Sequence, residues 1–170
     1  PSALGAATPT DVSTAVNGIQ IGGTNMLLNT GNFTTTNYWT TNAVTSVISD
    51  STFISCLEVQ STSINGIYQP PANIIDIGDS YTISFYAKSD SEITLYYALD
   101  GSQTSNAKSI TLSTSWVRYS GTFTSTGNNT KIRFYASDTF YITYIKLEKG
   151  NKATSWSPAP EDVDASISTA

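Results

Sequence analysis

Few residues in this chain could carry out acid–base or nucleophilic chemistry. Its 170 residues include no histidine and one cysteine, Cys56. A Cys/His zinc site, a disulfide framework and catalysis by a Ser–His or Cys–His pair are therefore excluded. Hydrolysis would have to use two carboxyl groups, for which Glu58 with Glu92 or Asp100 are the candidates. Because these acids form no short motif together, we expect a protein without catalytic activity.

Outward-pointing aromatic and cationic side chains are the other chemically informative group. Side chains alternate along a strand, so Tyr96 points away from the apolar face of the stretch 92–99. By the same rule, Lys131, Arg133 and Tyr135 point away from the apolar face of the stretch 131–137. Flat rings combined with a few planar polar groups are typical of binding surfaces. Outward tyrosine and arginine are also ordinary strand residues, since aromatic side chains favour sheets whatever their function.

The elements that would position these residues are short strands. Alternating apolar and polar residues predict strands at Met26–Leu28, Ala43–Ile48, Phe53–Gln60, Tyr81–Lys88, Glu92–Leu99, Trp116–Thr124, Lys131–Ser137 and Phe140–Glu148. Turn-forming residues separate many of them, for example in the stretches 76–79, 100–106 and 125–129. The pattern predicts an all-β fold, a β-sandwich of two antiparallel sheets.

The two ends of the chain differ from this strand-rich region. We divide the chain into a linker or possible short helix at 1–23, a module at 24–162, and the start of a linker or helix at 163–170. Thr10 could cap the first helix, and Val163 and Ile167 are spaced for the second. At the end of the module, the sequence predicts an irregular segment that closes the domain, which we call the clasp; it contains Gly150, Trp156 and two prolines on either side of Ala159. The ends are either disordered, or helical or coiled-coil connectors that could make a longer protein oligomeric.

Composition limits the partners. Charged residues make up 12% of the chain, about half the usual share. The formal net charge of −5 argues against a nucleic-acid partner, because basic residues must neutralise phosphate. No apolar run approaches the length of a membrane span. A surface rich in Ser, Thr and Asn suits a secreted or virion-borne β protein that hydrogen-bonds neutral partners.

Four stretches together resemble a known family. They are TNMLLNTGNFT near the start, YTISFYAKSDSEITLYYAL as a middle hairpin, WVRYSGTFT, and the ending YIKLEKGNKATSWSPAPEDV. They are similar to jelly-roll carbohydrate-binding modules in tail and baseplate proteins of phages or prophages of Gram-positive bacteria. The resemblance implies a jelly roll that binds host cell-wall or surface polysaccharide. It also implies a location in the virion tail, with other tail or baseplate proteins as partners.

The resemblance also implies where a sugar would bind. In such modules a concave sheet holds the ligand, and the strands Phe53–Gln60, Glu92–Leu99 and Lys131–Ser137 should share that sheet. The candidate carbohydrate-binding residues are then Tyr96, Tyr135, Arg133, Glu58, Gln60 and Lys131. Two further aromatic residues in predicted loops are Trp39, which could instead plug one end of the sandwich, and Tyr68. The opposite, convex sheet should carry Tyr86, Lys88 and Arg118, while Trp116 and Trp156 are expected to be structural.

Related jelly rolls often carry an acidic pair in the last strand, near a structural calcium ion. The corresponding positions here are Thr143 and Tyr144, and calcium prefers several oxygen ligands that include carboxylates. We therefore expect no metal or other cofactor, although backbone carbonyls and Glu148 could still contribute ligands. Two functions remain open: saccharide adhesion, and a structural spacer or protein-interaction domain with no ligand of its own.

Overall fold

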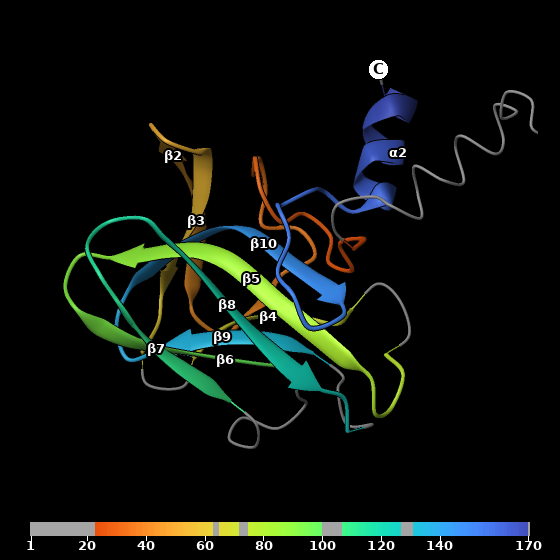
Figure 1. Ribbon diagram of the computed structural model, residues 1–170. Coiled ribbons are helices and arrows are strands. Elements are labelled where there is room, and N and C mark those ends of the chain that lie inside the picture. The colour runs from red at the N-terminus through yellow and green to blue at the C-terminus, as the bar shows by residue number, and fades with distance from the viewer. Residues whose placement is uncertain (1–22, 63–64, 72–74, 100–106, 127–130, 170) are drawn as a thin grey trace, which may run out of the picture.

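The two layers of the fold are antiparallel sheets of five strands each (Figure 1). The computed structural model describes residues 23–62, 65–71, 75–99, 107–126 and 131–169. Sheet A contains, in spatial order, β1 (Thr40–Thr41), β4 (Gly66–Gln69), β9 (Ile132–Ala136), β6 (Ile93–Leu99) and β7 (Lys108–Leu112). Sheet B contains β2 (Val44–Asp50), β3 (Ile54–Gln60), β10 (Phe140–Lys149), β5 (Ser80–Ser89) and β8 (Val117–Thr124). The predicted all-β sandwich is confirmed.

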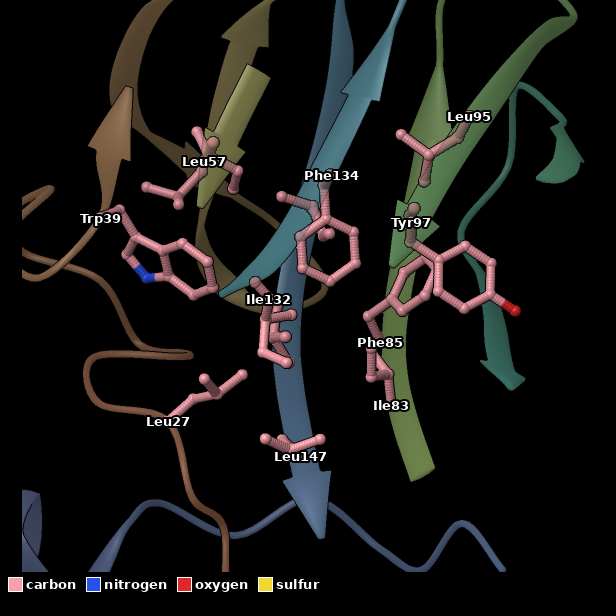
Figure 2. Packing of buried hydrophobic residues seen from close by; sticks show 14 of the residues in the cluster. Leu27, Trp39, Leu57, Ile83, Phe85, Leu95, Tyr97, Ile132, Phe134 and Leu147 are labelled. Atoms are coloured by element: carbon pink, nitrogen blue, oxygen red, sulfur yellow. The ribbon is translucent and has the colours of Figure 1, made fainter. Parts of the chain in front are cut away.

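The core lies between the sheets and is built from alternate residues of their long strands. Figure 2 shows Ile83 and Phe85 of β5, Tyr97 of β6 and Phe134 of β9 meeting there. The rings of Phe85 and Phe134 pack edge to face with centroids 5.0 Å apart, and Tyr97 packs against Phe85 at 5.1 Å. Because the neighbours of these residues along each strand point outward, burying this face fixes which side chains the outer faces present.

Two aspects of the predicted topology are wrong. The turn after Ser89 leads from β5 in sheet B to β6 in sheet A, so the two strands do not form the predicted hairpin. The strand β3 pairs with β2 and β10 in sheet B, and so does not share a sheet with β6 and β9. In a sandwich, a short connection can cross from one sheet to the other as readily as it can join two neighbouring strands of the same sheet.

Strand assignments also differ locally. The predicted strand Met26–Leu28 is irregular, although Met26 donates a backbone hydrogen bond to the Leu147 carbonyl at 2.8 Å and Leu27 is buried. Three strands were not predicted, namely β1, β4 and β7. Tyr68, expected in a loop, lies in β4. These strands are short or poor in apolar residues, so alternation gives a weak signal.

The end of the module is held by the predicted clasp. A bulge interrupts the pairing of β10 with β5 between Thr143 and Lys146 and turns Tyr144 outward, where its ring stacks on Trp156 at 4.2 Å. The ammonium group of Lys146 donates to the Ser155 carbonyl at 2.9 Å, and burial lowers its pKa. The segment after β10 is thereby held against the outer face of sheet B.

The C-terminal tail is helical. Helix α2 (Pro160–Thr169) begins with a proline and has Glu161 and Asp162 in its first turn, where the helix dipole favours acidic residues. Figure 1 shows it extending away from the sheets. The possible helix at 1–23 lies outside the described residues, apart from residue 23. No helix in the described part of the chain is long and apolar enough to cross a membrane.

Candidate functional site

Five of the predicted site residues come together on the outer side of sheet A. We call this surface the tyrosine–cation face; it consists of Tyr68, Tyr96, Lys131, Arg133 and Tyr135. Its positions follow from strand register, because Tyr96 lies opposite Tyr135 across β6 and β9, and Tyr68 lies opposite Arg133 across β4 and β9. Lys131 immediately precedes β9. Three strands that are distant in sequence therefore contribute to one surface.

The two tyrosines at the centre of this face are stacked. The ring centroids of Tyr96 and Tyr135 are 5.3 Å apart and the ring planes differ by 12°. Tyr96 is 40% exposed, whereas Tyr135 is only 6% exposed, so one ring and not two is open to a ligand. Burial raises the pKa of Tyr135, which keeps its hydroxyl protonated.

A glycine is required beside this pair. Gly66 of β4 lies opposite Tyr135. A Cβ at position 66 would be 1.9 Å from the carbonyl oxygen of Phe134, far inside any permitted contact. The absence of a side chain lets β4 pair with β9, and this pairing in turn places Tyr68 beside the cations.

The two cations of the face share one aromatic ring. The Lys131 Nζ lies 4.4 Å from the centroid of the Tyr68 ring and the Arg133 Cζ lies 5.2 Å from it. Both distances are within the range of cation–π attraction. Arg133 is only 8% exposed, and its Nε is buried without a hydrogen-bond partner among the described residues. The face therefore combines one open ring with two positive groups.

Glu58 and Gln60 do not belong to this face. They lie on the outer side of sheet B, because β3 is in that sheet. There the Gln60 Nε2 donates to the Glu58 Oε1 at 3.2 Å, and Glu58 lies opposite Tyr141 of β10. Their assignment to the site with Tyr96 and Arg133 is wrong, because it depended on placing β3 in the other sheet.

Trp39 is not at the rim of the site either. It is 5% exposed, and its indole N–H donates to the Asn29 carbonyl at 2.7 Å. Figure 2 shows its ring pointing into the core, where its centroid is 6.3 Å from that of Phe134. Trp39 thus fills the sandwich, which was the alternative interpretation of this residue.

Sequence reasoning missed an aromatic cluster on the outer side of sheet B. Phe53 packs against Tyr86 at 4.8 Å, Tyr144 at 5.0 Å and Trp116 at 5.2 Å, measured between ring centroids. Trp156 extends the cluster through its stacking on Tyr144. The expected position of Tyr86 on the sheet opposite Tyr96 is confirmed. The two tryptophans, expected to be structural, pack against Phe53 and Tyr144. Outward alternation of β5 could have suggested Tyr86. Phe53 and Trp116 lie just before β3 and β8, and Tyr144 lies at the bulge in β10, so alternation does not predict that these rings meet.

Beside this cluster the polar groups of sheet B are bonded to one another. The Trp116 indole donates to Asp50 at 3.2 Å, and the Tyr141 hydroxyl donates to Asp90 at 3.0 Å. The Lys88 Nζ lies 5.2 Å from the Trp116 ring and 5.5 Å from the Tyr141 ring. Burial, followed by the hydrogen bond to Asp90, raises the pKa of Tyr141 to about 12.

The residues at the end of β10 do not fit a structural calcium ion. Thr143 is fully buried and its hydroxyl donates to the Ser55 carbonyl, while Tyr144 stacks on Trp156. Both carboxylate oxygens of Glu148 already accept hydrogen bonds, from the backbone of Gly23 and from Thr154. The described residues contain no group of three or more acidic, cysteine or histidine side chains that could hold a metal.

Solved structures with the same fold include several sugar-binding modules. One is the xylan-binding domain CBM22-1 of Xyn10C from Paenibacillus barcinonensis, with TM-score 0.61, 14% identity, and coverage of 78% of this chain and 99% of that one. Another is the CBM22-1–GH10 part of Clostridium thermocellum xylanase 10B, solved with xylohexaose, with TM-score 0.56, 12% identity, and coverage of 79% and 30%.

A third is the enzymatically active domain of tailspike protein 4 from bacteriophage CBA120. Its TM-score is 0.54 and its identity 12%, and the match covers 74% of this chain but only 21% of that one. At such identities these structures establish the fold alone. A search of curated proteins found no match. The family model described as "Carbohydrate binding domain" matches residues 25–138, which is more than half of the chain. The chain therefore belongs to this family of carbohydrate-binding domains.

Proposed function

We propose that this carbohydrate-binding domain holds its saccharide on the tyrosine–cation face. The observation that carries the proposal is the open ring of Tyr96, stacked on Tyr135, on the same face where Lys131 and Arg133 lie over the Tyr68 ring. A pyranose can stack its C–H face on the Tyr96 ring, while the neighbouring polar groups bond its hydroxyls. Stacking on Tyr135 orders the Tyr96 ring before the ligand arrives, which reduces the entropy lost on binding.

The family is one of non-catalytic binding modules, and this chain binds carbohydrate without transforming it. We further propose that the saccharide belongs to the cell wall or surface of a Gram-positive host and that the domain is an adhesion module of a phage tail or baseplate protein. The supporting observations are the low charge of the chain, the connector-like ends of its sequence, and the use of the same fold in a phage tailspike. Neither a metal nor another cofactor is part of the proposal.

A single open ring supports only weak binding, about millimolar to micromolar in dissociation constant. Several copies on one particle would raise the strength of attachment through their effective concentration. Oligomerisation through the flanking segments of the full-length protein would supply those copies. Adhesion should therefore require multivalent display, whereas the isolated domain should bind and release quickly.

The test is isothermal titration with cell-wall polysaccharide from candidate host strains. Tyr96→Ala should weaken binding by about tenfold or more, because the open stacking surface is lost. The melting temperature should change little, since Tyr96 lies on the outer face of the sheet and is not part of the core. Tyr86→Ala, which removes a ring from sheet B, is the matched control and should leave binding unchanged.

Full binding by Tyr96→Ala, or loss of binding in Tyr86→Ala alone, would reject the assigned face. Adhesion is tested separately by displaying the domain on beads and counting attachment to host cells with and without their surface polysaccharide. Equal attachment to both cell types would contradict a saccharide receptor. Tight binding to a neighbouring tail protein, with no binding to any polysaccharide, would identify a spacer instead.

A further inference from the structure

The guanidinium group of Arg133 has an unusual environment for a buried charge. Its side chain is more than nine-tenths buried, and its Nε has no hydrogen-bond partner among the described residues. The guanidinium lies over the Tyr68 ring, and its charge also acts on the neighbouring Tyr135 hydroxyl. Buried charges are ordinarily paired or fully hydrogen-bonded, because an ion loses its hydration when it leaves water. The buried Nε of Arg133, which has no partner among the described residues, therefore needs a separate explanation.

The other buried cation of the described chain is satisfied. Lys146 is 1% exposed; its Nζ bonds Thr154 and Ser155 and lies 4.0 Å from the Glu148 carboxylate. The remaining ion pairs among the described residues belong to Lys149 and do not involve Arg133 or Lys131. The protein thus supplies partners for a buried cation elsewhere but not on the tyrosine–cation face.

The positive charge of this face is reinforced by a second cation. The Lys131 ammonium lies over the same Tyr68 ring, 4.4 Å from its centroid. Two like charges beside one ring repel each other, and a cation–π contact offsets this only in part. Neither cation has a carboxylate partner among the described residues. An anion bound beside both cations would offset this repulsion and could bond the terminal nitrogens of the guanidinium, which are not among the fully buried unpaired atoms.

We propose that the tyrosine–cation face binds saccharides carrying an acidic group, either a uronate carboxylate or a phosphate ester. The proposal rests on the proposed function and specifies its ligand class. The planar fork of a guanidinium matches the two oxygens of a carboxylate or phosphate, and such charge-assisted bonds are among the strongest available. The acidic substituent bonds Arg133 and Lys131, while a sugar ring of the same chain stacks on Tyr96.

This ligand class differs from the neutral partner suggested by the composition. The net charge of −5 describes the whole chain, but charges act on a ligand locally. Sheet A presents Lys131 and Arg133 on this face, whereas Glu58, Asp50 and Asp90 gather on or beside sheet B. The negative net charge of the whole chain therefore does not determine which ligands the tyrosine–cation face attracts.

The test is isothermal titration with paired polysaccharides. One pair is polygalacturonate and its carboxyl-reduced form, and the other is a phosphomannan before and after removal of its phosphate. At least one acidic member should bind about tenfold or more tightly than its neutral partner, and the difference should shrink at high ionic strength. Comparison of the two pairs distinguishes carboxylate from phosphate.

Three variants separate charge recognition from folding. Arg133→Met keeps much of the apolar stem and should abolish the preference for the acidic member, while the melting temperature stays unchanged or rises because an unpaired buried charge is removed. Lys131→Met should reduce the preference less, since Lys131 is more exposed. Arg133→Lys should restore only part of it, because an ammonium lacks the planar fork.

The outcomes distinguish this inference from the function on which it rests. Equal affinity for acidic and neutral members, with binding lost in Tyr96→Ala, would overturn the acidic ligand and leave saccharide binding intact. Absence of binding to every polysaccharide, host wall included, would overturn both. A large fall in melting temperature in Arg133→Met would mean that the guanidinium is structural, which also overturns the inference.

Discussion

The outer faces of the two sheets carry similar residue types, but the polar groups of the two faces differ in whether they have partners within the protein. On sheet A, Arg133 and Lys131 contact an aromatic ring but have no carboxylate partner among the described residues. On sheet B, polar groups pair with one another, as in the bonds of Trp116 to Asp50 and Tyr141 to Asp90. Aromatic and charged side chains on a strand therefore do not by themselves mark a binding site.

This difference determines how much a bound ligand can gain from each face. A polar group that already has a partner must exchange it on binding, and the net gain is small. A group that lacks a partner has lost its hydration on folding, so a ligand that bonds it adds stability. On the outer face of sheet B, Trp116 and Tyr141 therefore already have partners, and we call this face closed. The face on sheet A holds the Arg133 Nε, which has no partner among the described residues.

The largest effect should come from disrupting the close pairing of β4 with β9, which supports the tyrosine–cation face. Gly66→Ala should lower the free energy of unfolding by about 3 kcal/mol, because its Cβ would collide with the Phe134 carbonyl. It should also abolish saccharide binding by displacing Tyr68 from Arg133. Denaturant unfolding and titration measure the two losses.

Gly78→Ala is the control for this change. Gly78 has φ of +88° but open space around it, so the substitution strains the backbone without a collision and should cost about 1 kcal/mol. Binding should be retained. If both glycine variants lost stability and binding equally, the close approach of β4 to β9 would not be what supports the face.

A smaller effect, on stability alone, should follow from removing an aromatic ring from the cluster on the outer side of sheet B. Trp116→Ala removes the edge-to-face contact with Phe53 and the bond to Asp50 and should destabilise the fold by about 2 kcal/mol. Affinity for saccharide should stay within about twofold of the unmodified domain. A large loss of affinity without unfolding, measured by titration, would show that sheet B takes part in binding and would end the contrast between the faces.

The smallest effect should appear only at alkaline pH. Cys56 lies under the outer face of sheet B at 1% exposure, and burial raises its thiol pKa from 9.0 to about 12. The unfolded chain therefore loses this proton first, and stability falls as pH rises from about 9 towards 12. In Cys56→Ala the fall should begin later, near pH 10, where Tyr141 takes over.

Denaturant midpoints at a series of pH values would measure this shift. The native Cys56 thiol should also react slowly with a maleimide until the fold opens. Fast labelling of the native protein, or identical pH curves for the two proteins, would mean that the surface over Cys56 is open to solvent. Sheet B would then no longer be the closed member of the comparison.

Alternation in the sequence was sufficient to predict the longer strands and the direction of their side chains. The outward positions of Tyr96, Arg133 and Tyr135 follow from burying Tyr97 and Phe134 between the sheets. It could not assign strands to sheets, because the polar turn after Ser89 is compatible with either a hairpin or a crossing between layers. The misplacement of Glu58 and Gln60 comes from the family resemblance, which implied that β3 shares a sheet with β6 and β9.

The exposure and the bonding partners of each site residue were harder to predict than the side of the strand from which its side chain points. Tyr135 faces outward yet is 6% exposed, since stacking and neighbouring chain cover it. Tyr68 belongs to a strand of four residues, too short for alternation to identify, and its pairing requires Gly66. The lack of a partner for the Arg133 Nε depends on three strands at once and leaves no trace in the sequence.

The clasp has a mechanical consequence for any protein that contains this domain. The side-chain amide of Asn25 donates to the Ile145 carbonyl and to the Ser157 carbonyl, both at 2.9 Å, so the chain enters and leaves the sandwich through one small set of bonds. A pulling force applied between residue 23 and α2 would load those bonds before it reached sheet A. The strands of the proposed binding face would thus be shielded from tension while attachment is under strain.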